Sequence, residues 1–272
     1  MILEHFTLNY LSSHISCHRF GHGSRTVICF PGYGETGKAY SLLAGEATSA
    51  FSFFCVDLPF HGGTGWKEQR PFLPADLLAV RDLLIARQNV QETGYYLMGF
   101  SLGGRVALQL YHADPSRVLR LLLLAPDGLR SGFWFSFSGT WIGNRIFRIL
   151  LLQSRLLPPL LYIIGKTGLV DKSRLKFVDN YLRDGESRRL VYRRWTALGK
   201  MRTRRSEIRR LILDQHTITR LLYGRFDRVI TAADGAKFNA SIQPYGKLAV
   251  MDCGHQLLLP KNKKTIIAAL TD

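Results

Sequence analysis

The pentapeptide Gly99-Phe100-Ser101-Leu102-Gly103 constrains the fold of this chain more than any other stretch. It follows an apolar, strand-like run that begins at Tyr95, and it precedes a helical pattern that ends at Asp114-Pro115. A serine between two glycines at such a junction is expected at the apex of a tight strand–turn–helix reversal, with a strained backbone and an exposed hydroxyl. The glycines are needed because a Cβ atom at either flank would collide with neighbouring backbone. The pentapeptide alone is a weak signal, so its interpretation depends on the motifs around it.

Apolar runs typical of buried strands alternate with helical patterns along most of the chain. The expected strands cover 26–30, 51–57, 95–98, 118–124, 217–223 and 247–251, and the expected helices cover 36–48, 74–89, 102–112, 231–240 and 262–271. This alternation predicts an α/β fold with a mostly parallel sheet and helices on both faces. In such sheets the chemistry gathers at the carboxyl ends of the strands, where each motif discussed here falls.

The stretch 129–206 breaks this rhythm and differs in charge. We predict a core formed by 1–128 and 207–272, and a helical, basic insertion over 129–206. The whole chain has a formal net charge of +17, and residues 130–208 hold 17 Lys and Arg against 5 Asp and Glu. This excess favours an anionic partner, although a solvated helix face is the usual meaning of such charge. Aromatic and leucine residues over 131–164 either line an apolar acyl pocket or only form the core of the insertion.

A serine hydroxyl needs a neighbouring base to act as a nucleophile at neutral pH. His255 is the best placed of the eight histidines, because it follows the last strand-like run; we expect Gly254 to let this loop turn the imidazole inward. Asp227 follows the penultimate strand and would orient the imidazole. Asp127, which follows the strand after the Ser101 helix, is an alternative acid. The order Ser101, Asp227, His255 differs from the two other common serine triad orders.

Four motifs together resemble the α/β-hydrolase superfamily, more narrowly its capped single-domain esterases, carbon–carbon bond hydrolases and haloperoxidase-like enzymes. They are residues 30–34 (FPGYG), residues 57–64 (DLPFHGGT), the Ser101 turn, and residues 224–227 followed by Gly254-His255. The resemblance implies an α/β-hydrolase fold with a helical cap inserted after the strand that follows the Ser101 helix. It also implies an oxyanion hole formed by the backbone N–H groups of Tyr33 and Leu102. Pro31 departs from the commoner His-Gly pair, which puts the hydrogen bonding of this loop in doubt.

The combined reading predicts a serine hydrolase that cleaves a carboxylic ester or thioester with an apolar acyl part. Acyl transfer or carbon–carbon cleavage on the same triad, and a non-catalytic binding protein using the basic insertion, are alternatives. We expect no cofactor and no metal, and we interpret His61 as structural because no second ligand lies at metal-binding spacing. The expected partners are a small acyl ester or thioester, which the charge favours as anionic, and an anionic membrane surface in peripheral contact. No motif supports nucleic-acid binding.

The cysteines and the termini bear on the compartment. Cys29, Cys55 and Cys253 lie in apolar runs and, together with Cys17, show no paired spacing, which is typical of buried free thiols. The first residues lack a signal-peptide pattern, and the apolar stretch 149–164 is too short and too interrupted to span a bilayer. We therefore expect a cytoplasmic protein that contacts the inner membrane surface peripherally at most.

Overall fold

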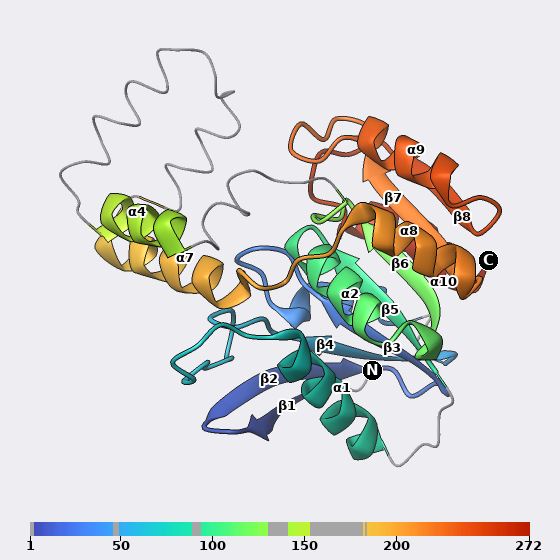
Figure 1. Cartoon of the computed structure of the whole chain (residues 1–272). Helices are drawn as coiled ribbons and strands as arrows, with labels where there is room; N and C mark the ends of the chain where they lie inside the picture. Colours follow the sequence, from blue (N-terminus) through green and yellow to red (C-terminus); the bar gives the residue numbers. More distant parts are fainter. Residues whose placement is uncertain (1–2, 46–48, 89–93, 130–140, 153–181, 183) are drawn as a thin grey trace. The chain divides into compact units, whose positions relative to one another are not determined.

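The fold is built on one eight-stranded sheet with the strand order β1-β2-β4-β3-β5-β6-β7-β8 (Figure 1). The computed structural model describes residues 3–45, 49–88, 94–129, 141–152, 182 and 184–272. The strands are β1 (Leu3–Tyr10), β2 (Ser13–Phe20), β3 (Arg25–Phe30), β4 (Phe51–Val56), β5 (Tyr95–Phe100), β6 (Val118–Leu124), β7 (Ile218–Gly224) and β8 (Gly246–Met251). Strand β2 is antiparallel to β1 and β4, and all other pairings are parallel. The predicted α/β fold with a mostly parallel sheet is confirmed.

The central strands are buried on both faces, which explains their continuous apolar sequences. Every residue of β4 is buried, and in β6 only Leu119 is exposed. All four cysteines are buried and free, as expected from their apolar surroundings.

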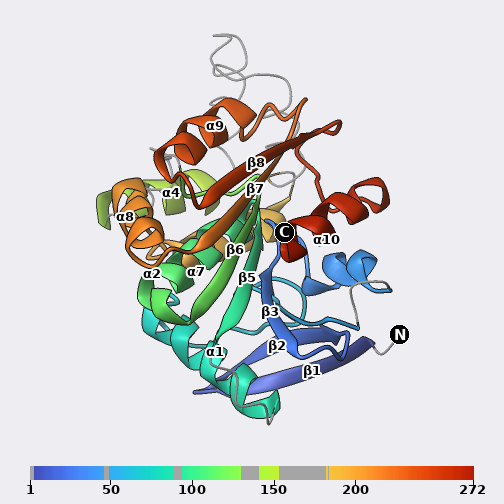
Figure 2. The ribbon, with the colours of Figure 1, turned by 90° about the vertical axis from the view of Figure 1, so that its right-hand side faces the viewer.

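Helices cover the two faces of the sheet unequally (Figure 2). One face carries α1 (Pro74–Gln88), α2 (Leu102–Ala113), α8 (Arg205–Asp214) and α9 (Ala232–Ser241), and the other carries α10 (Lys263–Thr271) and the 3-10 helix η1 (Gly37–Leu43). Two further 3-10 turns are η3 (Pro115–Arg117) and η4 (Pro260–Asn262). Helix α2 packs against β3 and β5, so it begins directly beneath the end of the strand that leads into it.

Two local expectations differ from the structure. In the described part of the helix expected over 36–48, residues 36–45, the chain forms only the 3-10 helix η1. Gly37 N–H donates to Asp57 Oδ1 just after β4, and a Cβ atom on Gly37 would lie 2.6 Å from Cys55 Cβ, so the start of this segment packs tightly against β4. The structure also contains the β1–β2 hairpin, which was not predicted from the sequence. Its turn places Leu11 at φ 54° and so lacks the glycine or asparagine that normally marks a two-residue hairpin turn.

The chain divides into two compact units, residues 1–130 with 201–272, and residues 131–200. In the second unit α4 (Trp141–Leu152) packs against α7 (Gly185–Leu198), and the hydroxyl of Tyr192 donates to Asn144 Oδ1 at 2.8 Å. The aromatic run at 133–137 and most of the leucine-rich stretch lie outside the described residues. The function of this unit as a cap stays a prediction. Within the described part of the chain, no helix has both the length and the apolar character needed to cross a membrane.

Candidate active site

Ser101 lies at the junction of β5 and α2 in a backbone conformation that L-residues rarely adopt. Its φ is 50° and its ψ is −116°. Three hydrogen bonds hold this conformation: Ser101 N–H donates to the Leu124 carbonyl at 2.9 Å, and its own carbonyl accepts from Gly104 N–H at 2.9 Å and from Asp127 N–H at 2.8 Å. Hydrogen bonds to the end of β6, to the loop after it and to the first turn of α2 therefore stabilise the strained backbone conformation of Ser101.

The two flanking glycines are needed by the packing of this turn. A Cβ atom on Gly99 would lie 2.5 Å from the carbonyl oxygen of Gly103, and a Cβ atom on Gly103 would overlap the carbonyl of Phe30. Both contacts involve backbone atoms, which a rotamer change cannot relieve. The expected role of these glycines is confirmed.

His255 hydrogen-bonds to both other members of the expected triad. Its Nε2 lies 2.9 Å from Ser101 Oγ, and its Nδ1 lies 2.7 Å from Asp227 Oδ2. An ionised carboxylate only accepts hydrogen bonds, so Nδ1 carries the proton and Nε2 accepts from the serine hydroxyl. The histidine side chain is 29% exposed, whereas the Asp227 side chain is fully buried. The imidazole is thus partly open to solvent, whereas its carboxylate partner is enclosed by protein.

Asp227 is fixed by the loop that follows β7. Its second oxygen, Oδ1, accepts from the N–H groups of Val229 and Ile230 at 2.7 and 2.9 Å. Both carboxylate oxygens are thus occupied, so the acid has one orientation toward His255.

The glycine required near His255 is Gly224 and not Gly254. A Cβ atom on Gly224 would overlap the carbonyl oxygen of Gly254, whereas a Cβ atom on Gly254 would meet nothing within 4 Å. The packing therefore gives Gly254 no steric role in the turn of this loop, which was expected of it, and gives that role to Gly224. Because Gly224 at the end of β7 has no side chain, the backbone of residues 253–254 can pass close to it, and this brings His255 to Ser101.

Asp127 pairs with Arg105, whereas the alternative triad would need it to pair with His255. Its two oxygens accept from Arg105 Nε and Nη2 at 2.9 and 2.8 Å. Arg105 is 6% exposed and lies on α2, so Asp127 neutralises a buried cation. Together with the Asp127 N–H bond to Ser101, this pair fastens the loop after β6 to the serine turn.

The loop after β3 is held by a carboxylate that the sequence did not single out. Gly32 N–H donates to Glu35 Oε2 at 3.4 Å, and Glu35 N–H donates to the Gly32 carbonyl at 3.1 Å. Gln256, next to the candidate base, donates to Glu35 Oε1 at 2.5 Å. Glu35 therefore supplies the hydrogen bonding that Pro31 had put in doubt, and it links the Tyr33 loop to the His255 loop.

The electrostatics of Glu35 are set mainly by burial, which raises the pKa of its carboxyl group above the usual range. Hydrogen bonds from Gln256 and Gly32, and the charge of His255, act in the opposite direction. Nothing in the local sequence marks Glu35 as special, because its partner Gln256 lies 221 positions away.

The backbone N–H groups of Tyr33 and Leu102 remain the candidates for an oxyanion hole. Leu102 is the first residue of α2, and the first amides of a helix have no acceptor within that helix. Tyr33 lies in the turn after β3, and its ring packs edge-on against His61 with centroids 5.7 Å apart.

The 57–64 loop is held in place by buried hydrogen bonds of Asp57 and His61. Asp57 is 1% exposed; it accepts from Gly37 N–H at 2.6 Å and from Ser16 Oγ at 2.9 Å. Burial opposes ionisation of Asp57, but hydrogen bonds from His18, Gly37 and Ser16 outweigh it and hold its pKa below the usual range. His61 is fully buried, and its Nδ1 lies 2.9 Å from the Pro59 carbonyl oxygen.

Known proteins share this architecture and part of this sequence. A protein-family model described as "Alpha/beta hydrolase family" matches residues 27–267. Over 192 residues the chain is 30% identical to a dihydrolipoyllysine-residue acetyltransferase component of an acetoin cleaving system from Cupriavidus necator, a match that covers 67% of this chain and 45% of that protein. Over 112 residues it is 31% identical to a pimeloyl-[acyl-carrier protein] methyl ester esterase from Aeromonas salmonicida, a match that covers 41% of each.

The structure superposes on solved structures over its full length. A thioesterase domain from the curacin biosynthetic pathway matches with a TM-score of 0.66 and 16% identity, covering 100% of both chains. Each match to the two curated relatives spans less than half of that relative's length, so their activities are not transferred by similarity alone. The extent of the family match, together with this fold, shows that the chain belongs to the alpha/beta hydrolase family.

Proposed function

We propose that this protein hydrolyses a carboxylic ester or thioester with an apolar acyl part, through an acyl-enzyme on Ser101. The observation that supports this most is the hydrogen-bonded series from Ser101 Oγ to His255 (2.9 Å) and from His255 to buried Asp227 (2.7 Å). A serine at a strained turn, a base within reach of its hydroxyl, and a fixed acid behind the base are what nucleophilic catalysis at a carbonyl requires.

In the acylation step Ser101 Oγ forms a bond to the carbonyl carbon while its proton passes to His255 Nε2. Asp227 stabilises the imidazolium through the Nδ1–H bond and stays ionised. The N–H groups of Leu102 and Tyr33 stabilise the charge on the carbonyl oxygen, and one such donor contributes about 2.7–4 kcal/mol to the transition state. His255 then gives its proton to the leaving alcohol or thiol as the bond from the acyl carbon breaks.

Deacylation repeats these steps with water. The water oxygen attacks the acyl carbon, and His255 Nε2 takes one water proton. The acyl–Oγ bond then breaks, His255 returns the proton to Ser101, and a carboxylic acid leaves.

The first experiment compares wild type with Ser101→Ala, using p-nitrophenyl acyl esters and acyl thioesters of graded length together with a fluorophosphonate probe. We expect the substitution to abolish both turnover and labelling, because it removes the attacking oxygen, while the melting temperature changes little. Persistent labelling of the variant would contradict the assignment of Ser101 as nucleophile.

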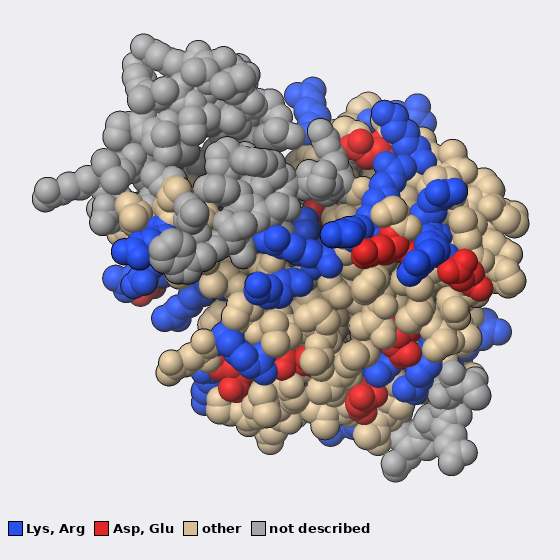
Figure 3. Space-filling model, viewed as in Figure 1, with Lys and Arg blue, Asp and Glu red and all other residues tan. Residues whose placement is uncertain are grey.

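We further propose that the substrate is attached to an anionic group, such as coenzyme A or a phosphopantetheine carrier. Helix α7 carries Arg188, Arg189, Arg193 and Arg194 against one acid, Glu186. Blue Lys and Arg side chains recur over α7, and separately over α8, on the face shown in Figure 3. The relative from Aeromonas salmonicida is named for an ester of an acid held by an acyl-carrier protein, which supports the same class of substrate.

Ionic strength tests this part of the proposal. The value of kcat/KM for a coenzyme A thioester should fall steeply with added salt, and that for a neutral p-nitrophenyl ester should change little. The Arg189→Gln/Arg193→Gln variant should lower the affinity of the protein for coenzyme A, measured by calorimetry, whereas a Lys237→Gln/Lys264→Gln control should keep it. If the same arginines hold an anionic membrane, co-sedimentation with anionic vesicles will weaken in high salt, and salt-resistant sedimentation would oppose an electrostatic contact.

Acyl transfer is a second candidate, favoured by the name of the Cupriavidus necator relative. The same acyl-enzyme would then react with an alcohol or thiol in place of water. Product analysis with a competing thiol acceptor separates the two reactions, because a transferase forms the new thioester at millimolar acceptor whereas a hydrolase releases mainly the free acid.

A further inference from the structure

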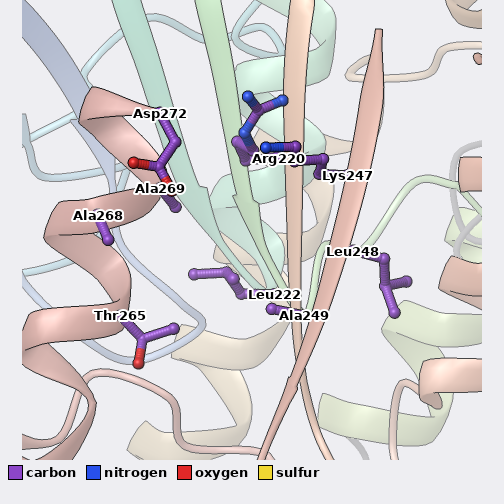
Figure 4. Close-up of a pocket in the computed structure, with 9 residues that line it drawn as sticks. All are labelled: Arg220, Leu222, Lys247, Leu248, Ala249, Thr265, Ala268, Ala269 and Asp272. Atoms are coloured by element: carbon purple, nitrogen blue, oxygen red, sulfur yellow. The ribbon is translucent and has the colours of Figure 1, made fainter. Parts of the chain in front are cut away.

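A pocket of about 170 Å³ lies between α10 and strands β7 and β8, on the sheet face opposite α2 (Figure 4). Arg220 and Lys247 line one part of it, and the apolar side chains of Leu222, Ala249 and Ala268 line another. Arg220 lies near the start of β7, whereas Asp227 follows the end of this strand. The pocket is therefore displaced along β7 from the candidate active site.

Three cationic side chains share this face of the sheet. Arg220 of β7 is in register with Lys247 of β8, and Arg120 of β6 is in register with Ile218, two residues before Arg220. Residues in register on neighbouring parallel strands, and residues two apart on one strand, project from the same face. In Figure 4 the ends of Arg220 and Lys247 lie toward one another. Like charges on neighbouring strands repel, so this arrangement favours an anion between them.

The two arginines are buried without a carboxylate partner among the described ion pairs. Arg120 is 7% exposed and donates to the Ala269 carbonyl at 3.2 Å, and Arg220 is 8% exposed and donates from Nη1 to the Thr219 carbonyl at 3.3 Å. Arg220 Nε is buried and has no hydrogen-bond partner. A buried polar group of this kind is unusual, because burial without a partner is unfavourable. Desolvation and the charge of Arg120 lower the pKa of Arg220, and the charge of Asp272 acts in the opposite direction.

The geometry of the available donors indicates the class of ligand. Nη1 of Arg220 is engaged and Nε is buried, so Nη2 of Arg220 and Nζ of Lys247 are the donors left for a ligand, and two neighbouring cationic donors suit the two oxygens of a carboxylate. The apolar wall next to it suits a short hydrocarbon chain. A cavity of about 150 Å³ can hold a six-carbon ring, so the volume of the pocket suits a short acid.

We propose that this pocket binds a small aliphatic carboxylate, with its carboxylate group on Arg220 and Lys247 and its chain against Leu222, Ala249 and Ala268. Asp272, which also lines the pocket, is the acid whose charge acts on Arg220. It would compete with the ligand for the same cations. The proposal goes beyond the proposed function and does not depend on catalysis by Ser101.

The test is a titration of the full chain with sodium butyrate, followed by calorimetry and NMR, at ionic strength held constant with sodium chloride. We expect saturable binding that weakens at least tenfold in Arg220→Gln and several-fold in Lys247→Gln. Asp272→Asn should strengthen binding because it removes the competing charge. The matched control, Lys237→Gln on α9, removes one exposed positive charge elsewhere and should bind butyrate like wild type.

Several results would overturn the proposal. Butyrate binding that is unchanged in Lys247→Gln, or n-butanol binding as tightly as butyrate, would exclude the charged part of the site. Inorganic phosphate binding as tightly as butyrate would replace the carboxylate assignment with a general anion site. Since Arg220→Gln alters a buried residue, its melting curve is measured first; if it does not fold, the exposed Lys247→Gln and Asp272→Asn variants decide the question.

Discussion

Replacing Asp227 by asparagine tests the orientation of His255 with little change in shape. Asp227 Oδ1 accepts from the N–H groups of Val229 and Ile230, which have to keep an oxygen acceptor. The substituted side chain therefore keeps its oxygen toward these amides and points its NH₂ group at His255 Nδ1. Nδ1 then becomes an acceptor, the proton moves to Nε2, and Nε2 no longer accepts the proton of Ser101.

The magnitude follows from this change of tautomer. In serine triads the corresponding substitution lowers kcat about 10⁴-fold, which corresponds to about 5.4 kcal/mol of transition-state stabilisation. The packing and the two amide bonds persist, so the free energy of unfolding should fall by only about 1–2 kcal/mol. Steady-state hydrolysis of a p-nitrophenyl ester gives the first quantity, and urea denaturation gives the second.

Asp127→Asn is the matched control, because it makes the same chemical change in the alternative acid. Its loss leaves Arg105 buried with one fewer charged partner, so stability should fall by about 1–3 kcal/mol while the folded protein keeps most of its activity. Asp227→Asn should therefore lose mainly activity, whereas Asp127→Asn should lose mainly stability. Asp227→Asn retaining more than a tenth of wild-type kcat, or Asp127→Asn losing activity as severely, would refute this reasoning.

Three further predictions concern the supporting contacts. Gly103→Ala places a Cβ atom against the Phe30 carbonyl, so it should lower the free energy of unfolding by about 3 kcal/mol and abolish probe labelling. Gly254→Ala places its Cβ atom in open space and should change neither quantity. Thermal melts and probe labelling check both variants. Because burial raises the pKa of Glu35, its contribution to stability is present below the unfolded-state value of 4.5 and is lost as pH rises through the folded-state pKa. The melting temperature of Glu35→Gln should therefore gain on wild type as pH rises, and an equal gap at all pH values would oppose this. Asp57→Asn should lower the free energy of unfolding by about 1.5–3 kcal/mol near pH 7, since the substitution removes the negative charge and one of the two acceptor oxygens. The pKa of Asp57 is lowered, so the difference in stability from wild type should shrink as pH falls below 3.8, which thermal melts in acid would test.

Much of the sheet is predictable from the sequence because its central strands are buried on both faces. The runs at 51–56 and 118–124 contain little but apolar residues, and the structure places both in strands. Strands β1 and β2 escaped prediction because they lie toward one edge of the sheet and mix polar with apolar residues. The remaining signal is the alternation of buried and exposed residues, as at Phe6 and Leu8. This pattern is short, and the turn that follows has Leu11 at a positive φ where glycine or asparagine is usual.

The positions of Ser101, Asp227 and His255 at strand ends are also readable from the sequence, because parallel strands bring their carboxyl ends together. Their hydrogen-bonded geometry follows that expectation, and their catalytic roles stay predictions. Glu35 was not predictable in the same way. Its importance depends on contacts between two loops, and the Gln256 amide that it accepts from lies on a different loop whose course no local pattern specifies.

The choice between the two acids illustrates what a sequence can still reveal once burial is considered. Asp127 and Asp227 both follow strands, so strand position alone leaves both as partners of His255. Arg105 distinguishes them, because it lies in the apolar α2 helix, four residues after Ser101, where ten consecutive residues are buried. A carboxylate within reach stabilises a guanidinium buried in such a helix, and the loop after the adjacent strand β6 supplies Asp127. Asp127 is thus engaged by the buried arginine, whereas Asp227 lies 2.7 Å from the imidazole of His255.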